Sequence, residues 1–140
     1  MKPLQRLIRL HQSKLDDERS TLAALEAREQ ELRTAATTLE IEFEQECLLA
    51  SLSPDGTLSL PGYIEGVRHR RNGFALALQD IALDLETARE RVREAYGELK
   101  RFEIMGEQRA LAEKRAATRR EQSTLDELGL TMYRRRSKTH

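Results

Sequence analysis

Apolar residues recur along the chain at alternating steps of four and three positions. A first series runs from Leu4 to Ala50, and ten of its fourteen positions are apolar. Steps of three and four place side chains along one seam of a helix, as in coiled coils. The pattern therefore predicts a helix over residues 3–52. Its seam comprises Leu4, Ile8, His11, Leu15, Glu18, Leu22, Leu25, Glu29, Leu32, Ala36, Leu39, Phe43, Glu46 and Ala50.

A second series follows a break in the pattern. Proline and glycine stand together at residues 53–56, and again at Pro61-Gly62, and these residues favour turns. The second seam is apolar throughout at Phe74, Leu78, Ile81, Leu85, Ala88, Val92, Ala95, Leu99 and Phe102. We expect a loop over residues 53–62, a second helix over residues 63–128, and a basic tail over residues 129–140 that frays.

Two long helices joined by a short link are expected to fold back on each other. The sequence therefore predicts an all-α fold, an antiparallel two-helix coiled-coil hairpin that forms a single domain over residues 1–140. Helices that end at residue 52 and resume at residue 64 give facing residues whose numbers sum to about 116, which puts Leu15 near Phe102. In this register the second helix outlasts the first by roughly 16 residues. We expect this C-terminal helical overhang at the open end of the hairpin.

Composition agrees with a helical rod. Ala, Leu, Glu, Lys and Arg supply 79 of the 140 residues, above the roughly one-half that is typical of coiled coils. Two Val and five Ile argue against a β-sandwich or barrel. Without a signal peptide or a run of about 18 apolar residues, the chain is expected to be cytoplasmic, or peripheral at the cytoplasmic face of the inner membrane. Its single cysteine, Cys47, fits a reducing compartment.

Charge is sorted along the chain, although the net charge is zero. Residues 1–14 carry four bases and no acid, residues 16–46 carry ten acids and three bases, and residues 101–120 carry six bases and three acids. The open end is therefore expected to be basic. It also holds more apolar surface than the second helix is expected to cover, from Leu4, Leu7, Ile8 and Leu10.

The sequence offers no enzyme chemistry. It has no glycine-rich phosphate loop, and its three histidines are far apart. Consecutive acids such as Asp16 and Asp17 point in different directions on a helix. We therefore expect a protein that is not an enzyme and that binds no metal and no cofactor. The arginines of residues 68–71 and 134–136 lack interleaved aromatic residues, and the zero net charge argues against nucleic acid as a partner.

Three segments of the sequence are similar to one protein family. Residues 1–26 resemble the N-terminal helix of FliJ, the small coiled-coil protein of the flagellar type III export apparatus. Residues 121–128 resemble that family's C-terminal signature, in which a Gln precedes a hydrophobic-Asp-Glu-hydrophobic run. Residues 96–102 are similar to a segment with an aromatic, basic residues and a second aromatic, although Tyr and Phe stand here where other members often carry Trp.

The resemblance implies a fold similar to the central stalk of rotary ATPases, and a role in export. The open end would enter the hexameric export ATPase, and the chain would also contact the membrane export-gate protein and export chaperones while being a monomer alone. The residues expected at the ATPase are Leu4, Arg6, Ile8, Arg9, Arg119, Arg120, Gln122, Leu125, Asp126, Glu127 and Leu128. Those expected at the export gate are Leu39, Phe43, Tyr63, Val67, Phe74 and Leu78.

Two other functions stay open on the sequence. A virulence-type secretion stalk protein, of the YscO type, would share the architecture. A generic structural coiled coil that self-associates would share the periodicity, although its self-association would need a face other than the seam, which the hairpin already uses.

Overall fold

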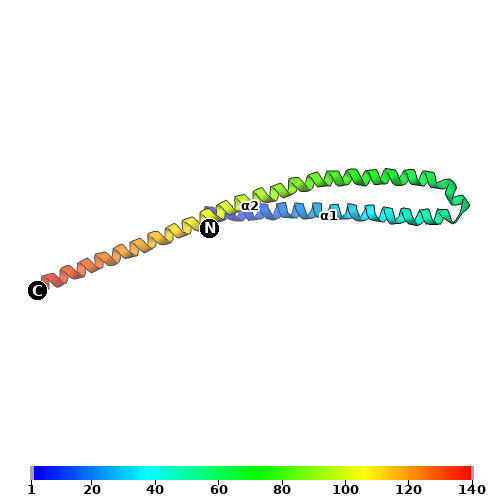
Figure 1. Ribbon diagram of the computed structural model, residues 1–140. Helices are drawn as coiled ribbons and strands as arrows, with labels where there is room; N and C mark the ends of the chain where they lie inside the picture. Colours follow the sequence, from blue (N-terminus) through cyan, green and yellow to red (C-terminus); the bar gives the residue numbers. More distant parts are fainter. Residues whose placement is uncertain (1, 140) are drawn as a thin grey trace. The chain divides into compact units, whose positions relative to one another are not determined.

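The computed structural model describes residues 2–139, with side chains for residues 2–53 and 59–138, so Met1 and His140 lie outside the described residues. It contains two helices, α1 (Pro3–Ser51) and α2 (Pro54–Thr139), and no strand in the described residues (Figure 1). The two helices pack against each other, which confirms the predicted all-α helical hairpin. The chain divides into two compact units, here called the hairpin unit (Ser13–Tyr96) and the terminal unit (Met1–Gln12 with Gly97–His140).

The core of the hairpin unit follows the predicted seam. On α1, every seam position from Leu15 to Ala50 is buried or half-buried except Glu46, whose place Cys47 takes. On α2, the apolar series from Phe74 to Ala95 is likewise buried or half-buried, and Leu85 is only 2% exposed. Burial of one leucine side chain contributes about 1.5–3 kcal/mol. The periodic leucines are therefore the main stabilising feature of this unit.

The turn of the hairpin unit is shorter than predicted. Leu52 and Ser53 alone separate the helices, because α2 already begins at Pro54. The expected loop over residues 53–62 is therefore wrong. Proline suits the first turn of a helix, where its missing N–H would have no partner. The N–H groups of Leu52 and Ser53 donate to carbonyls three residues earlier and so close the last turn of α1.

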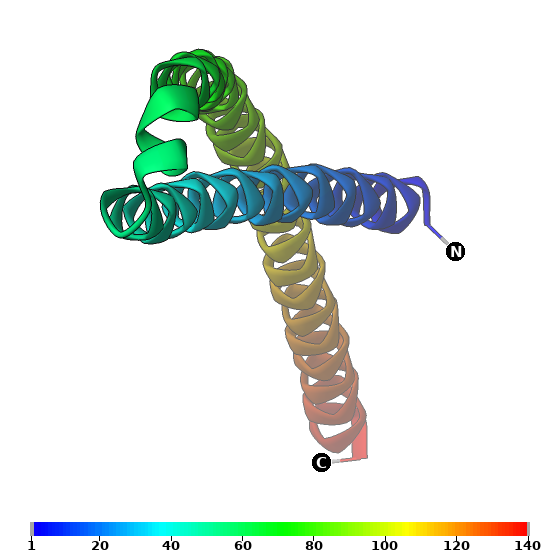
Figure 2. The same ribbon diagram turned by 90° about the vertical axis from the view of Figure 1, so that its right-hand side faces the viewer.

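Pro61 lies inside α2. A proline within a helix has no N–H for the carbonyl four residues before it, and its ring bends the helix. Figure 2 shows the first turns of α2 as a bridge between the last turn of α1 and the rest of α2. This helical bridge replaces the expected loop. It brings Leu60 to the same hollow as Ala50.

The terminal unit pairs the start of α1 with α2 about one turn away from the expected register. The expected partner of Phe102 is Leu15, but the Phe102 ring stacks on His11 with ring centroids 4.6 Å apart. The prediction assumed that pairing starts at residue 64. In the hairpin unit, Leu60 and Ala50 already line a common hollow, so the helices there lie side by side before residue 64.

The end of α2 also differs from the prediction. The helix continues to Thr139, so the expected end at residue 128 and the frayed tail over residues 129–140 are wrong as far as the described residues extend. Gly129 has no positive φ and therefore does not cap the helix. Arg136 and Lys138 lie in the last turn, where positive charge interacts favourably with the helix dipole. All side chains from residue 118 to residue 138 are exposed, as expected for an overhang.

Within the described residues, no helix combines the length and the apolar character that a bilayer span requires.

Candidate functional site

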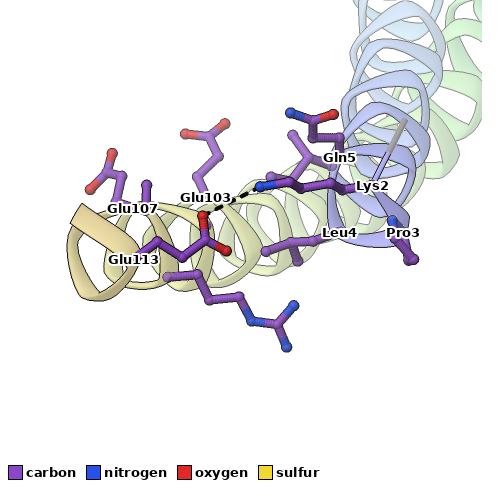
Figure 3. Close-up of a pocket in the computed structure, with 11 residues that line it drawn as sticks. Lys2, Pro3, Leu4, Gln5, Glu103, Glu107 and Glu113 are labelled. Atoms are coloured by element: carbon purple, nitrogen blue, oxygen red, sulfur yellow. Dashed lines mark hydrogen bonds and ion pairs between the residues drawn. The ribbon is translucent and has the colours of Figure 1, made fainter. Parts of the chain in front are cut away.

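A hollow of about 530 Å³ lies between the start of α1 and α2 in the terminal unit (Figure 3). Its apolar part is formed by Leu4 and Ile8 of α1, both half-buried, against Gly106 and Ala110 of α2. We call it the terminal groove. The groove is lined by Lys2, Pro3, Leu4, Gln5, Ile8, Glu103, Gly106, Glu107, Arg109, Ala110 and Glu113.

Gly106 helps to keep this groove open. A Cβ at this position would lie 3.5 Å from Ile8 Cδ1 and 3.7 Å from Leu4 Cδ2, which is ordinary van der Waals contact. The close approach of the helices therefore does not require glycine. The missing side chain instead leaves part of the apolar surface of Leu4 and Ile8 uncovered.

Charged side chains surround the terminal groove. Lys2 Nζ lies 3.4 Å from Glu113 Oε2 and links α1 to α2, and Lys100 Nζ lies 3.2 Å from Glu103 Oε2. Glu107 also lines the groove. The Lys2–Glu113 pair is exposed, so it contributes at most about 1 kcal/mol. The rim is therefore polar and adaptable around an apolar floor.

His11 closes the seam next to this groove. His11 is 8% exposed, and its ring stacks on the ring of Phe102 at an interplanar angle of 22°. Nδ1 lies 3.3 Å from Glu98 Oε2, within ion-pair distance but without hydrogen-bond geometry. Among the residues that the structure describes, no group of three His, Cys, Asp or Glu side chains could hold a metal. His11 thus serves as a packing residue of the terminal unit.

The residues expected at the ATPase all belong to the terminal unit, but they form two surfaces. Leu4 and Ile8 line the groove, while Arg6 and Arg9 are exposed on α1. The remaining seven are exposed on α2, beginning six residues, or about 9 Å of helix, beyond Glu113. Among them Leu125 is 63% exposed and Leu128 is 55% exposed. These two leucines lie three residues apart, on one face of the overhang.

The residues expected at the export gate lie in the hairpin unit, where two of them are not on the surface. Leu39 and Val67 are each 2% exposed and belong to the core. Neither side chain offers surface to a partner in this structure. Phe43, Tyr63, Phe74 and Leu78 are half-buried and offer part of their side chains.

An aromatic cluster organises this half of the hairpin unit. The rings of Phe43 and Tyr63 are stacked with centroids 6.1 Å apart, and the Arg71 guanidinium carbon lies 4.8 Å from the Phe43 centroid. Arg71 also forms a two-point ion pair with Glu40 on α1. The sequence prediction missed Glu40 and Arg71 as a pair. The available signal was Arg71 itself, which stands three residues before Phe74 and so continues the spacing of the second apolar series with a charged residue.

The contacts of this cluster shift the pKa values of Glu40, Arg71 and Tyr63. The hydrogen bond from Arg71 lowers the pKa of Glu40, and the same bond raises the pKa of Arg71. Desolvation raises the pKa of Tyr63, and the nearby charges of Glu46 and Glu42 raise it further. Glu40 therefore stays ionised at neutral pH, and the Tyr63 hydroxyl stays a neutral hydrogen-bonding group.

Two hollows flank the aromatic cluster. One, of about 310 Å³, is lined by Ala36, Thr37, Leu39, Glu40, Arg71, Phe74, Ala75 and Leu78. The other, of about 350 Å³, is lined by Glu46, Leu49, Ala50, Ser59, Leu60 and Tyr63. Both hollows are lined by residues of α1 and α2.

Comparison with known proteins decides the family. Residues 1–138 match the family model described as "Flagellar FliJ protein". The chain belongs to the FliJ family. The flagellar FliJ proteins of two Caulobacter vibrioides strains, NA1000 / CB15N and ATCC 19089 / CIP 103742 / CB 15, are each 26% identical to it over 124 residues, which cover 89% of both chains. No solved structure matches. The resemblance of the sequence to FliJ is thus confirmed, and membership of the family gives the chain a role in flagellar export.

Proposed function

We propose that this FliJ-family chain is a non-enzymatic stalk and adaptor of the flagellar export apparatus, acting at the cytoplasmic face of the inner membrane. The terminal unit binds the hexameric export ATPase, the hairpin unit binds the membrane export gate, and the chain also contacts export chaperones. The observation that carries the proposal is the overhang of α2, where Leu125 and Leu128 are 63% and 55% exposed.

The ATPase contact combines the overhang with the terminal groove. Exposed leucines on one face of a helix do not stabilise that helix when it stands alone in water. A helix that enters a ring, by contrast, needs apolar side chains as anchors. Leu4 and Ile8 in the groove add a second apolar contact. Apolar anchors near the centre of an interface supply most of the binding energy.

Charge gives this contact its orientation. Arg6 and Arg9 of α1 and Arg119 and Arg120 of α2 are exposed bases, whereas the pair Asp126-Glu127 is acidic. The bases would meet acidic residues of the ring and the acidic pair would meet basic residues, since complementary charges fix the register of an interface.

The gate contact uses the surface of the aromatic cluster. Phe43, Tyr63, Phe74 and Leu78 are partly exposed there, and the flanking hollows are open. Leu39 and Val67 support this surface from the core. Partly buried aromatic rings are suitable anchors because their orientation is already fixed before binding.

Capture of the ATPase tests the proposal. The full chain should recover the hexameric export ATPase from an extract, and a chain that lacks residues 121–140 should not. The deletion should leave the thermal midpoint nearly unchanged, because the side chains of residues 121–138 are exposed. Equal recovery of the ATPase by both chains would contradict the proposal. A midpoint that collapses on deletion would mean that the segment belongs to the fold.

A self-associating structural coiled coil is the second candidate. The observation in its favour is a set of exposed apolar residues on α1, with Ile41, Leu48 and Leu49 at 51%, 67% and 60% exposure. Sedimentation of the purified chain separates the two functions. A monomer supports the stalk, and a stable dimer or trimer supports the structural coiled coil.

A further inference from the structure

The outer face of α1 in the hairpin unit carries an uncharged stripe. At about 100° per residue, one set of residues from position 23 to position 48 projects within about 40° of Ile41, on the side of α1 away from the seam. None of them is charged, although charged residues make up 34% of the chain. We call this set the outer stripe. Its members, all of them exposed, are Ala23, Ala27, Gln30, Thr34, Thr37, Ile41, Gln45 and Leu48.

Polar side chains of the outer stripe are engaged within α1. The Thr37 hydroxyl donates to the carbonyl oxygen of Arg33 at 3.0 Å. Gln30 Nε2 donates to Thr34 Oγ1 at 3.5 Å. These groups therefore need less from water than their residue types suggest. The short side chains of the stripe also permit a close approach of a second helix, because the distance between packed helices depends on the side chains at the contact.

Acidic side chains flank the apolar end of the outer stripe, where Ile41 is 51% and Leu48 is 67% exposed. Glu42 follows Ile41 by one residue and Glu44 follows it by three, which places the two acids on opposite sides of it. Both acids are exposed, and residues 34–51 contain four acids and no base. A partner that covers Ile41 and Leu48 therefore brings its own flanking side chains next to two carboxylates.

These flanks select the occupant by charge. A second copy that packed its outer stripe on this one would bring Glu42 and Glu44 against the same acids, and like charges across an interface are unfavourable. A polyanion is disfavoured for the same reason. A helix with apolar residues at a and d, and with Lys or Arg at the flanking e and g positions, would instead cover the stripe and pair with both acids.

We infer that the outer stripe of α1 binds a basic amphipathic helix of a partner protein. Ile41 and Leu48 are the apolar anchors of this contact, and Glu42 and Glu44 set the orientation of the bound helix. The contact goes beyond the proposed function, because the outer stripe contains none of the residues assigned to the ATPase or to the export gate.

Binding of a designed peptide to the purified full chain tests the inference. The probe is a fluorescent peptide of three heptads with Leu at a and d and Lys at e and g. Anisotropy at about 0.15 M salt should show binding that weakens as salt rises, and no binding of a matched peptide with Glu at e and g. A peptide of the same composition in scrambled order, which has no apolar face, should bind at least tenfold more weakly. Absence of binding by the Lys peptide, or equal binding by either control peptide, would overturn the inference.

Two variants test whether the peptide binds on the outer stripe. Ile41→Ser with Leu48→Ser should weaken peptide binding about ten- to a hundredfold, as expected for the loss of interface anchors. Glu42→Gln with Glu44→Gln keeps every apolar residue and should weaken binding about fivefold, with the difference disappearing at high salt. Unchanged affinity in either variant would overturn the inference.

Leu76 and Leu83 provide the matched control on α2. They are 62% and 65% exposed and lie seven residues apart, as Ile41 and Leu48 do, but Asp80 lies between them on the same face. Leu76→Ser with Leu83→Ser should leave peptide binding unchanged. A loss equal to that of the Ile41 and Leu48 variant would mean that the peptide binds any exposed leucine, and the inference would be wrong.

The Ile41 and Leu48 variant also separates this contact from the other proposals. It should still capture the ATPase. If the unaltered chain sediments as a dimer and this variant as a monomer, the outer stripe binds a second copy and the inference is overturned. Binding of the Lys peptide without ATPase capture by the unaltered chain would refute the proposed function and leave the helix contact supported.

Discussion

Arg71 of α2 and Glu40 of α1 are joined at two points, with Nε 2.5 Å from Oε1 and Nη2 2.6 Å from Oε2. The same guanidinium group lies over the ring of Phe43, which in turn stacks on Tyr63. One arginine thus connects the helices and positions two aromatic side chains of the proposed gate surface. A planar guanidinium can do both at once, whereas lysine cannot.

The Glu40–Arg71 pair predicts a dependence of stability on pH. The pair lowers the pKa of Glu40, so its contribution is fully present above the ordinary carboxyl value of 4.5 and is lost as pH falls through the lowered pKa. Glu40→Gln should therefore lower the free energy of unfolding at neutral pH and have no effect once Glu40 is protonated in acid. Urea unfolding across this range checks the prediction, with Glu44→Gln as an exposed control. An equal effect of Glu40→Gln at all pH values would contradict it.

Tyr63 is the most direct probe of the gate surface. Tyr63→Ser removes a ring that stacks on Phe43 and is partly exposed. It should weaken binding of the gate's cytoplasmic domain about tenfold, as expected for one aromatic anchor, and leave helicity intact. Titration calorimetry and circular dichroism provide the two measurements. Leu83→Ser, at a 65% exposed position of the hairpin unit, should leave affinity unchanged, and unchanged affinity for Tyr63→Ser itself would rule the contact out.

Leu85 is the largest fully buried side chain among the described residues. It is 2% exposed, so Leu85→Ala should lower the free energy of unfolding by about 2–5 kcal/mol through lost burial and an internal cavity. Leu83→Ala, two residues away and 65% exposed, should change it by less than about 0.5 kcal/mol. Denaturant unfolding of both variants provides the comparison. Similar losses would mean that the seam is placed on the wrong face of α2.

Gly106 and Gly97 test whether glycine is required inside α2. Its Cβ position is free of clashes, so Gly106→Ala should raise stability by about 0.5–1 kcal/mol through helix propensity. Gly97→Ala, where no atom lies within 4 Å of the added Cβ, should give a similar gain. Thermal unfolding of both variants checks the gain. A loss of stability in Gly106→Ala alone would mean that α1 lies closer to α2 than the structure has it.

The helical seam could be predicted because leucines at steps of three and four leave few alternatives to a two-helix fold. Glu46 is the one miss on α1, since Cys47 lies in the seam instead. Position by position, a periodic pattern identifies the buried face, but it does not fix the register between two helices. The stack of His11 on Phe102, in place of Leu15, illustrates this.

The turn was mispredicted because proline and glycine have two roles. Pro54 begins α2 and Pro61 lies within it, although both are common in loops. Likewise Gly129 stays helical where a helix end was expected. Burial of Leu39 and Val67, and the Glu40–Arg71 pair, depend on which residues of the two helices meet, which the sequence pattern alone does not specify.

The central claim is that the overhang of α2 binds the export ATPase, and stimulation of ATP hydrolysis tests it most directly. The unaltered chain should stimulate the purified hexameric ATPase. Leu125→Ser with Leu128→Ser should weaken this effect about ten- to a hundredfold, since each exposed leucine would be an interface anchor. Leu76→Ser with Leu83→Ser, at 62% and 65% exposed positions of the hairpin unit, should stimulate as the unaltered chain does. Full stimulation by the Leu125 and Leu128 variant would contradict the account.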